Sequence, residues 1–541
     1  MLPAQSRNIP FGRKTLGAPK KSLNHLVFWP PFLLLLLAVI LNLALPSTFG
    51  QIMTTAEKWV LDYFGWLFTL VTVLSLVVCL LVCFLPLGRV RLGGPQAQPL
   101  MTRWNWFAIT LCTTVAIGIL FWSTAEPLSH YYQPPASIGI PSESPESFRF
   151  AIAALFIHWS FLPYSIYCAA SLMFGFAYYN MRTHYSLGGT LVPLIGTEQA
   201  ERIGPVIDAV CLYSLVAGMA AALGAGILAI AGGLNQLGGV PSTPITWLLI
   251  TLFIVVSFIA SSASGLLKGI RILSDINAKA LFLLAGVVFV VGPTLRILVE
   301  SFYSLGVFAQ LLPQLLLVEG FFPTETWVRD WSIFYWAVWI AWTPVTACFL
   351  GRIAYGRTVR EFILFNLLIP SLFCIAWMGI FGVTTLHLEQ QGADLAPLVQ
   401  NDEFEKVSNA VLAILPLGSL MVGYYLLSAF VCYVTSADSN TTAMASLSEK
   451  GITQEDSEGD TKIKFVWGVM VGATAWTIIS YAGGVDGVRT LSDLGGLPAA
   501  FLLLLVLAAL VKVAWNPEKY DQTAKLQVPI QDREGSPPVA D

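Results

Sequence analysis

The sequence predicts an all-α membrane protein with twelve transmembrane helices. The first observation is composition: 56% of the 541 residues are hydrophobic and only 11% are charged. A soluble protein of this length carries about 25% charged residues, so lipid must cover most of this surface. The second observation is a series of apolar runs, each close to the roughly 20 residues that a membrane-spanning helix needs. The net charge of −3 gives no indication of a nucleic-acid partner.

The apolar runs follow one another along the chain. The expected spans lie at residues 27–47, 64–86, 106–125, 150–177, 205–232, 244–265, 278–300, 333–351, 362–386, 408–437, 463–484 and 492–512. The first run has no small-residue cleavage site, which favours a retained span over a signal peptide. The expected organisation is an N-terminal segment at 1–26, a twelve-span domain at 27–512 and a tail at 513–541. Both ends are polar, and disorder is expected before residue 26 and after Trp515.

The distribution of Lys and Arg gives an independent test of this topology, because basic residues accumulate in cytoplasmic segments. With the N-terminus inside, 23 of the 29 basic residues fall on the cytoplasmic side and 6 on the outer side. Those on the outer side are Lys58, Arg149, Arg296, Arg329, Lys406 and Arg489. Both termini are therefore predicted to be cytoplasmic, in a multi-pass protein of the cell inner membrane.

Three further features limit the class of protein. The stretch Ser304–Val318 is apolar but too short to span easily, and it is predicted to be an interfacial or membrane-dipping helix. No phosphate-binding P-loop is found, which argues against transport driven by ATP on this chain. The cysteines all fall in apolar runs, which favours a packing role over disulfides or zinc: Cys79, Cys83, Cys112, Cys168, Cys211, Cys348, Cys374 and Cys432.

Aromatic residues stand out in the fourth and eighth spans. In the fourth, Trp159, Tyr164 and Tyr167 fall at helix angles of roughly 0°, 140° and 80°, so they can line one side. Pro163 between them can bend the helix. These rings are candidates for a binding site within the membrane.

The eighth span carries Trp336, Trp339 and Trp342 at steps of three residues. A single membrane Trp such as Trp331 is as well explained as an interface anchor, but three on successive turns run about 9 Å through one span. An aromatic cage explains them better, because a trimethylammonium group donates no strong hydrogen bond and is held by ring faces. Ring contacts alone give about millimolar affinity, so the carboxylate of a zwitterion needs partners of its own.

The third span offers a candidate for those partners. Gly118 marks either a broken helix, whose exposed N–H groups suit a carboxylate, or a close contact between helices; the sequence does not separate the two. Glu126 and Pro127 are expected to close this helix at the outer face.

In the tenth span, Thr435 and Ser436 have two possible roles. Hydroxyls in membrane helices usually bond back to their own backbone. Combined with freed carbonyls of a neighbouring span, they can instead hold a sodium ion. Asp438 is expected to be solvated or paired with a basic residue at the cytoplasmic boundary.

At this point the residues resemble the betaine/carnitine/choline transporter family. The most specific piece is the eighth-span stretch Asp330–Trp339, continued by Gly356–Phe362. Further agreement comes from Thr124–Leu128, His158–Trp159, Lys268–Arg271 and Thr435–Ser439, so the match runs from the first span to the twelfth.

The resemblance implies a LeuT-like core of two inverted five-helix repeats, spans 3–7 and 8–12, with a substrate site near the bilayer midplane. It also implies a homotrimer. By position, the family's aromatic box falls on Trp159, Tyr164, Tyr167 and Trp339, with Trp336 and Trp342 flanking it along the pathway. Tyr164 replaces a more usual Trp, which keeps a ring face and adds a hydroxyl.

Two departures from the family pattern bear on substrate and coupling. The glycine-rich segment of the third span is reduced to Thr114–Gly118 and has no acidic residue of the kind found in choline-accepting relatives, which favours a zwitterion. Leu215 and Met219 stand where sodium-coupled relatives have threonines, so one sodium site is expected to be missing. The other looks intact, with the side chains of Thr435 and Ser436 and carbonyls near Cys112, Val115 and Cys432.

The predicted function is secondary active import of an onium zwitterion resembling glycine betaine, with Na⁺ as coupling ion at one site and no other cofactor. Asn277 is neutral where sodium-independent relatives carry an arginine. Sodium-independent exchange of betaine or carnitine is the alternative, and an onium-binding membrane sensor is the alternative of another class. An enzyme is not expected, because the spans hold no nucleophile–base set. The sequence does not separate betaine, carnitine, choline and dimethylsulfoniopropionate, or osmoprotectant uptake from nutrient supply.

Overall fold

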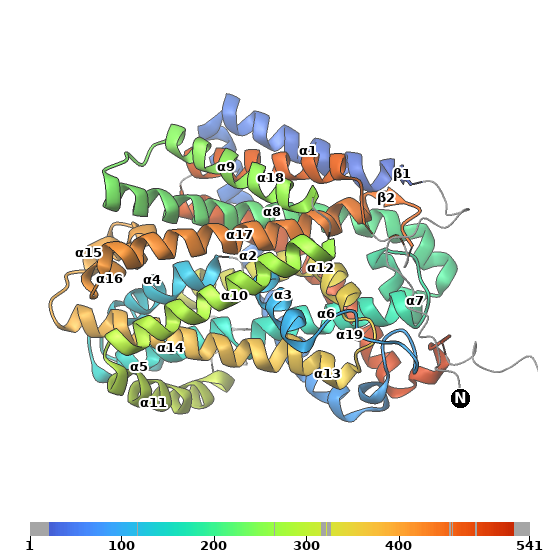
Figure 1. Ribbon diagram of the computed structural model, residues 1–541, viewed down its shortest axis with the longest axis horizontal. Coiled ribbons are helices and arrows are strands. Elements are labelled where there is room, and N and C mark those ends of the chain that lie inside the picture. Colours follow the sequence, from blue (N-terminus) through green and yellow to red (C-terminus); the bar gives the residue numbers. More distant parts are fainter. Residues whose placement is uncertain are drawn as a thin grey trace, which may run out of the picture.

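A computed structural model describes residues 21–115, 117–263, 266–314, 321, 326–453, 456, 458–481 and 484–523. Its long helices lie roughly along the longest axis of the molecule and stack in several layers (Figure 1). The strands β1 (Ser22–Leu23) and β2 (Glu449–Lys450) pair in antiparallel fashion. They tie the beginning of the described chain to the end of the tenth span.

The helices that form the spans come in the order of the predicted runs. They are α1 (His25–Ala44), α2 (Pro46–Phe84), α3 (Arg103–Val115), α4 (Gly118–Tyr132), α5 (Pro145–Trp159), α6 (Phe161–Tyr179), α8 (Thr197–Gly238), α9 (Pro244–Ala263), α10 (Leu266–Val291), the π-helical η5 (Val328–Ile333) with α12 (Phe334–Ile353), α13 (Val359–Ile363) with the π-helical η6 (Leu364–Leu368) and α14 (Ile369–Gln390), α17 (Gly418–Leu447), α18 (Thr461–Tyr481) and α19 (Val485–Trp515). The remaining helices connect or flank them: η1 (Pro86–Arg89), η2 (Ala136–Ile138), η3 (Leu187–Leu191), α7 (Val192–Ile195), α11 (Thr294–Pro313), α15 (Ala396–Gln400), α16 (Phe404–Ile414) and η7 (Pro517–Lys519).

The all-α class and the twelve spans are confirmed. In the described part of the chain, twelve helical segments are long and apolar enough to cross a membrane, and α3 with α4 passes the same test as one span bent by 53°. One of the twelve, α11, packs at the periphery against α5 and α14, and only 11% of its most apolar window is buried. Counting α3 with α4 as one span and setting the peripheral α11 aside leaves the twelve predicted spans. The first predicted repeat then runs from α3 to α10, and the second from η5 to α19.

The predicted edges around the seventh span were wrong. The structure ends α10 at Val291 and begins α11 at Thr294, whereas the sequence placed one span at 278–300. The segment predicted to form an interfacial or membrane-dipping helix from residue 304 belongs to α11, which already starts at Thr294, and residues 315–318 of that prediction lie outside the described part. Pro293 explains the break, because proline lacks an N–H and disfavours helical geometry in the residue before it.

Burial divides the spans into an inner and an outer set. In α5 with α6, in α8 and in η5 with α12, 94% of the most apolar window is buried. The corresponding share is 33% in α1 and 28% in α9. Since lipid-facing and core-facing positions are both apolar, the sequence pattern does not distinguish these two sets.

The inner helices approach one another through glycines. Where α6 crosses α12, a Cβ at Gly175 would lie 3.2 Å from the carbonyl oxygen of Gly351, and a Cβ at Gly351 only 2.7 Å from that of Ser171. Backbones approach this closely only where side chains are absent. This crossing brings the aromatic segments of the fourth and eighth spans together.

The predicted disorder after Trp515 was wrong for residues 516–523, and the predictions for residues 1–20 and 524–541 lie outside the described residues. Asn180, after the end of α6, holds the tail: its Nδ2 donates to Asp521 Oδ2 at 3.0 Å and to the Arg91 carbonyl at 3.1 Å. Gly93 N donates back to Asn180 Oδ1 at 3.0 Å. All eight cysteines are free, seven of them buried.

Candidate functional site

Four of the predicted aromatic residues meet at one point. The ring centroid of Trp339, on α12, lies 5.6 Å from that of Trp159, 5.5 Å from Tyr164 and 5.2 Å from Tyr167. The ring planes of these three neighbours make angles of 72°, 56° and 64° with the ring plane of Trp339. All four rings are buried. The structure thus brings together rings from the fourth and eighth spans.

The backbone of the fourth span is interrupted between the first two of these residues. Helix α5 ends at Trp159 and α6 begins at Phe161, with Ser160 at φ −118° and ψ −119°. Pro163 has no N–H to donate to the carbonyl of Trp159, so the regular hydrogen bond is lost there. The helix is therefore interrupted at Ser160. Because of this break, Trp159 belongs to a different helical segment from Tyr164 and Tyr167.

Gly118 combines both roles that the sequence left open. Helix α3 ends at Val115 and α4 begins at Gly118, so the third span is broken immediately before this glycine. A Cβ at Gly118 would lie 2.5 Å from Cη2 of Trp159. The first turn of α4, with its free N–H groups, therefore lies directly against a ring of the candidate cage.

Trp336 and Trp342 lie elsewhere on α12. The ring of Trp336 is 5.8 Å from that of His158, and Trp342 covers Gly218 on α8, where a Cβ would lie 2.7 Å from Cδ1 of Trp342. Both rings are buried. The three tryptophans thus point toward different helices, as their offsets around the axis require.

Trp339 also carries an unused donor. Its Nε1 is buried and has no hydrogen-bond partner in the described part of the chain. A buried N–H without a partner costs free energy of about 1–3 kcal/mol unless a ligand satisfies it. A ligand with a hydrogen-bond acceptor would therefore be stabilised beside Trp339.

The residues predicted to hold sodium lie where α17 meets the end of α3. Ser436 Oγ donates to the Thr113 carbonyl at 2.8 Å, across the two helices. Thr435 Oγ1 donates to the Val431 carbonyl at 2.7 Å, which is the backbone bond that membrane threonines usually make. The structure therefore brings Ser436 to the break in the third span, near Val115, and leaves Thr435 bonded within its own helix.

Asn277, on α10, lies beside the same helices. Cys432 Sγ donates to Asn277 Oδ1 at 3.3 Å, and Cys112 Sγ donates to the carbonyl of Ser274 at 3.5 Å, one turn before Asn277. Asn277 is fully buried and its Nδ2 has no partner among the described residues. Position 277 thus adjoins two of the residues whose carbonyls were predicted to ligate sodium.

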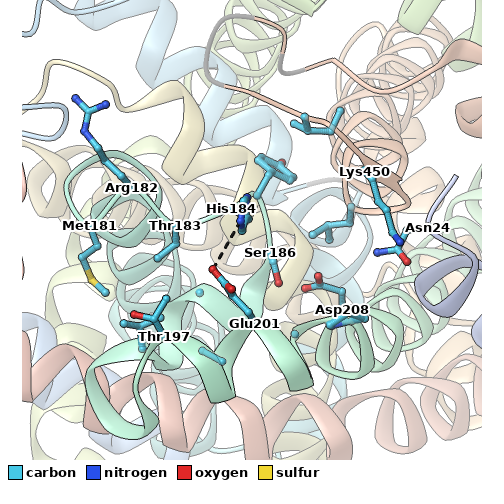
Figure 2. A pocket seen from close by; sticks show the side chains of 18 of the residues that line it. Asn24, Met181, Arg182, Thr183, His184, Ser186, Thr197, Glu201, Asp208 and Lys450 are labelled. Carbon is cyan, nitrogen blue, oxygen red and sulfur yellow. Dashed lines mark ion pairs between the residues drawn. The ribbon is translucent and has the colours of Figure 1, made fainter. Parts of the chain in front are cut away.

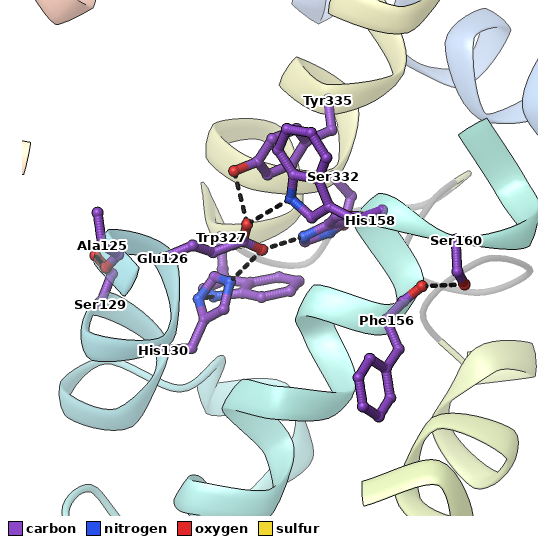
Figure 3. A network of polar contacts seen from close by, with 11 residues as sticks. Ala125, Glu126, Ser129, His130, Phe156, His158, Ser160, Trp327, Ser332 and Tyr335 are labelled. Atoms are coloured by element: carbon purple, nitrogen blue, oxygen red, sulfur yellow. Dashed lines mark hydrogen bonds and ion pairs between the residues drawn. The ribbon is translucent and has the colours of Figure 1, made fainter. Parts of the chain in front are cut away.

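Glu126 does not close its helix at the surface, contrary to the sequence-based expectation. Its side chain is fully buried and accepts hydrogen bonds at both oxygens. Oε1 lies 3.1 Å from His130 Nε2 and 2.6 Å from His158 Nδ1, while Oε2 accepts from Trp159 Nε1 at 2.9 Å and from the Tyr335 hydroxyl at 2.7 Å (Figure 3). The sequence offered one indication of this contact: Glu126 and His130 are four residues apart, which places them on neighbouring turns of one helix face.

Asp438 is likewise buried rather than solvated. It is 1% exposed, and Oδ2 accepts a hydrogen bond from Ser261 Oγ, on α9, at 2.5 Å. The expectation of a solvated carboxylate was wrong, because α9 packs against α17 and covers this side chain. As for the alternative of a basic partner, the donor at Oδ2 is the hydroxyl of Ser261 and not a basic residue.

A second group of rings surrounds a cation of the protein itself. The guanidinium carbon of Arg489, on α19, lies 5.2 Å from the ring centroid of Trp331, 5.5 Å from Phe334, 5.6 Å from Phe404 and 5.9 Å from Trp122. These distances are typical of cation–π contacts. The sequence did not indicate this cluster, because its rings come from α4, η5, α12 and α16.

A separate cavity lies away from all of these residues. It has a volume of about 670 Å³ and is lined by Arg182, His184, Glu201, Asp208 and Lys450, among others (Figure 2). His184 Nε2 lies 3.7 Å from Glu201 Oε1, and both side chains are largely exposed. The cavity mixes charges of both signs and contains none of the predicted site residues.

Comparison with known proteins finds similarity along nearly the whole chain. The family profile described as "BCCT, betaine/carnitine/choline family transporter" matches residues 26–519. The glycine betaine transporter OpuD of Bacillus subtilis is 32% identical over 490 residues, or 90% of this chain and 93% of that protein. An ectoine/hydroxyectoine transporter of Virgibacillus pantothenticus is 29% identical, covering 92% and 98%. The osmo-dependent choline transporter BetT2 of Acinetobacter baylyi is 27% identical, covering 91% and 72%.

Proposed function

The chain belongs to the betaine/carnitine/choline transporter family, and from this premise we propose that it imports a zwitterion with an onium group, such as glycine betaine. Family membership establishes a multi-pass membrane transporter and not an enzyme. The observation that carries the substrate class is the convergence of Trp159, Tyr164 and Tyr167 on Trp339.

The inclination of these rings suits a methylated cation. Trp159 and Trp339 meet at 72°, so they form a corner in which one cation can lie over two faces. Each desolvated contact of this kind contributes about 2 kcal/mol. A quaternary ammonium or a sulfonium group fits equally, because neither donates a strong hydrogen bond.

The carboxylate of the substrate has two candidate partners close to the same rings. Trp339 Nε1 is a buried donor without a partner among the described residues. The first turn of α4 begins at Gly118, in contact with Trp159, and helix N-termini stabilise negative charge. A cation site adjoining two anion donors favours a zwitterion over free choline.

The names of the relatives give the range of substrates to test. They include transporters of glycine betaine, ectoine and choline. A panel of radiolabelled glycine betaine with unlabelled ectoine, carnitine, choline and dimethylsulfoniopropionate as competitors would rank them. We expect the zwitterions to compete more strongly than choline.

The cage role is tested by Trp339→Ala in proteoliposomes. Loss of one ring face should raise the half-saturating concentration of glycine betaine about 30-fold, which corresponds to about 2 kcal/mol. Trp339→Phe should retain most of the affinity. Trp66→Ala is the matched control, because Trp66 lies on α2 with 46% of its surface exposed. Unchanged affinity in Trp339→Ala would contradict the proposed site.

We further propose that one Na⁺ is coupled to transport, at Thr435, Ser436 and the carbonyls of Cys112, Val115 and Cys432. Support comes from Ser436, which reaches the end of α3 at the Thr113 carbonyl. Position 277, beside Cys432, holds a neutral side chain and not a cation. Hydroxyl and carbonyl oxygens at a broken helix are suitable ligands for Na⁺.

Replacement of external sodium by potassium should abolish accumulation of glycine betaine in proteoliposomes. Ser436→Ala should raise the sodium concentration required for half-maximal uptake, because one ligand is lost. Thr441→Ala is the control, since Thr441 lies on the same helix and bonds back to the Ala437 carbonyl at 2.7 Å. Unchanged uptake in potassium that requires substrate inside the vesicles would instead establish the alternative, sodium-independent exchange.

A membrane sensor that binds onium compounds without carrying them is the candidate of another class. Binding to purified protein with no uptake or counterflow in proteoliposomes would support it. We also propose an inner-membrane homotrimer with both termini cytoplasmic. The bias of Lys and Arg toward one side of the predicted spans supports the orientation. Cross-linking and mass measurement in native membranes test the trimer.

A further inference from the structure

The buried network around Glu126 is not used by the proposed transport function. Its carboxylate receives four contacts, from His130, His158, Trp159 and Tyr335. A carboxylate offers about four acceptor positions when ionised, whereas a protonated carboxyl must donate at one of them. Trp159 Nε1 and the Tyr335 hydroxyl already donate to Oε2, so the network fits an ionised Glu126. Its negative charge is fully buried.

The proton on His130 has only one position in this network. Trp327 Nε1 donates to His130 Nδ1 at 3.2 Å, and an indole nitrogen is a donor only. Nδ1 must therefore accept, and the ring hydrogen must lie on Nε2, where it faces Glu126 Oε1 at 3.1 Å. A second proton on His130 would place two N–H groups against each other. His130 is thereby held neutral.

The same argument decides against a metal ion at this cluster. The ligand atoms of Glu126, His130 and His158 all lie within 4.8 Å of one another, which is close enough to surround an ion. A metal at His130 Nε2 would require the ring hydrogen on Nδ1, where it would meet the N–H of Trp327. The hydrogen bonds around the cluster thus fit protons and not a metal.

His158 differs from His130 because its outer partner is a hydroxyl. Nδ1 lies 2.6 Å from Glu126 Oε1, and Nε2 lies 2.9 Å from Ser332 Oγ, on η5 (Figure 3). A hydroxyl can donate to a neutral Nε2 or accept from a protonated one. His158 can therefore gain or lose the Nε2 proton without losing either hydrogen bond. When His158 carries the Nε2 proton, the pair of His158 and ionised Glu126 has no net charge. When that proton is lost, the pair has a charge of −1.

Other ionisable groups on neighbouring elements do not cancel the change of charge that accompanies protonation of His158. From α12, Tyr335 donates to Glu126, and from α6 Tyr164 and Tyr167 contribute only phenols. Arg489, on α19, lies near the ring of Trp331 at 5.2 Å and keeps its charge at every pH near neutrality.

The charged groups of the remaining neighbours are engaged elsewhere. On α11, Glu300 pairs with Arg149 at 3.0 Å, and Arg296 contacts His387 of α14 at 2.7 Å. On η5, Arg329 pairs with Asp62 at 2.9 Å, and Asp330 is exposed. Protonation of His158 is therefore the change of charge that this network can accommodate.

We propose that His158 Nε2 is a proton-binding site that opposes binding of the onium group at the face of Trp159. The link is covalent and direct: Trp159 follows His158 in the chain, and its Nε1 donates to Glu126 Oε2 at 2.9 Å. When His158 is neutral, the buried negative charge lies at the N–H edge of the indole and stabilises a cation on the adjacent ring face. When His158 is protonated, that stabilisation is lost. This inference rests on the proposed function.

Reciprocity gives the consequence for transport. If a proton weakens binding of the onium group, then binding of the onium group must release the proton from His158 Nε2 to solvent. The apparent Kd for glycine betaine should fall as the pH rises and His158 loses the proton on Nε2, by at most tenfold per pH unit.

The test is titration calorimetry of the purified full-length protein with glycine betaine, in buffers that differ in ionisation enthalpy. The dependence of the measured heat on that enthalpy gives the number of protons released. Over a series of pH values we expect up to one proton in the wild type and none in His158→Asn, whose amide keeps the donor to Glu126. His387→Asn, outside the network, should release protons as the wild type does. No release in the wild type, or unchanged release in His158→Asn, would overturn the inference.

A second measurement needs no substrate and separates this inference from the proposed function. In protein labelled with ¹⁵N at histidine, His130 should keep its proton on Nε2 at every pH, while His158 gains a second proton as the pH falls. If no onium compound binds but these signals appear, the proposed function fails and the proton site stands. Retention of one Zn²⁺ per chain through His158, measured by metal analysis, would overturn it.

Discussion

Trp159 makes contacts on two sides that fix its position at the candidate site. Its indole nitrogen donates to Glu126, and its six-membered ring lies over Gly118. A hydrogen bond to an ionised carboxylate is worth about twice a neutral one. The indole is therefore held from one edge while its opposite edge depends on the absence of a side chain at position 118.

We expect Gly118→Ala to weaken transport without unfolding the protein. The new Cβ would lie 2.5 Å from Cη2 of Trp159, so the indole must move and the Glu126 bond must lengthen. The half-saturating concentration of glycine betaine should rise several-fold in an uptake assay. Gly286→Ala is a suitable control, because a Cβ there meets nothing within 4 Å. Equal affinity of the two variants would show that Trp159 does not need this contact.

At the scale of elements, the crossing of α6 and α12 decides how the rings of the two spans meet. Tyr164 and Tyr167 reach Trp339 because the two helices approach at Gly175 and Gly351. A separation of these helices would part the rings even if every ring residue were retained. The cage is therefore a property of a helix pair rather than of its aromatic residues alone.

We expect Gly351→Ala to destabilise the protein. The added Cβ would lie 2.7 Å from the Ser171 carbonyl and 2.9 Å from the Gly175 nitrogen, which are backbone atoms that do not yield locally. Overpacking of this kind costs about 1–3 kcal/mol and should lower the Tm measured in detergent. Gly423→Ala, at a helical position with open space, should leave the Tm unchanged or raise it slightly. A Tm for Gly351→Ala equal to that of the control would contradict the tight crossing.

At the scale of the whole molecule, Asn180 joins segments that are far apart in the sequence. Its side chain contacts Arg91 and Gly93 in the loop after η1 and Asp521 in the tail, and its carbonyl accepts from Gln522 N at 2.9 Å. The side chain is fully buried. It therefore connects the second span, the fourth span and the C-terminal tail at one end of the bundle.

Asn180→Ala should lower the Tm in detergent, because it removes three hydrogen bonds and leaves buried partners unsatisfied, at a cost of about 1–3 kcal/mol. Limited proteolysis should then cut the tail after Trp515 more rapidly. Asn235→Ala is the control, since Asn235 makes an exposed contact with the Val240 carbonyl. If the tail of Asn180→Ala resists protease as in the wild type, other contacts hold it.

The sequence predicted the class and the number of spans, because both depend on composition and on the lengths of apolar runs. Aromatic spacing indicated candidate rings in two spans, and the resemblance to the family selected the four that meet. The sequence missed features that depend on packing between distant helices. Glu126 has donors on α4, α5 and α12, and the rings near Arg489 come from four elements. It also misplaced the edge between α10 and α11, because residues on both sides of Pro293 are apolar. Hydropathy does not show where one apolar helix ends and another begins.

The mutual contact of the four rings has a consequence for permeability. Aromatic surfaces at centroid separations of 5.2–5.6 Å leave no room for a file of water molecules between them. If these rings hold the substrate, as proposed, the same residues would also form a hydrophobic barrier across its pathway. Such a barrier would limit leakage of ions through the protein and so preserve the ion gradients of the cell.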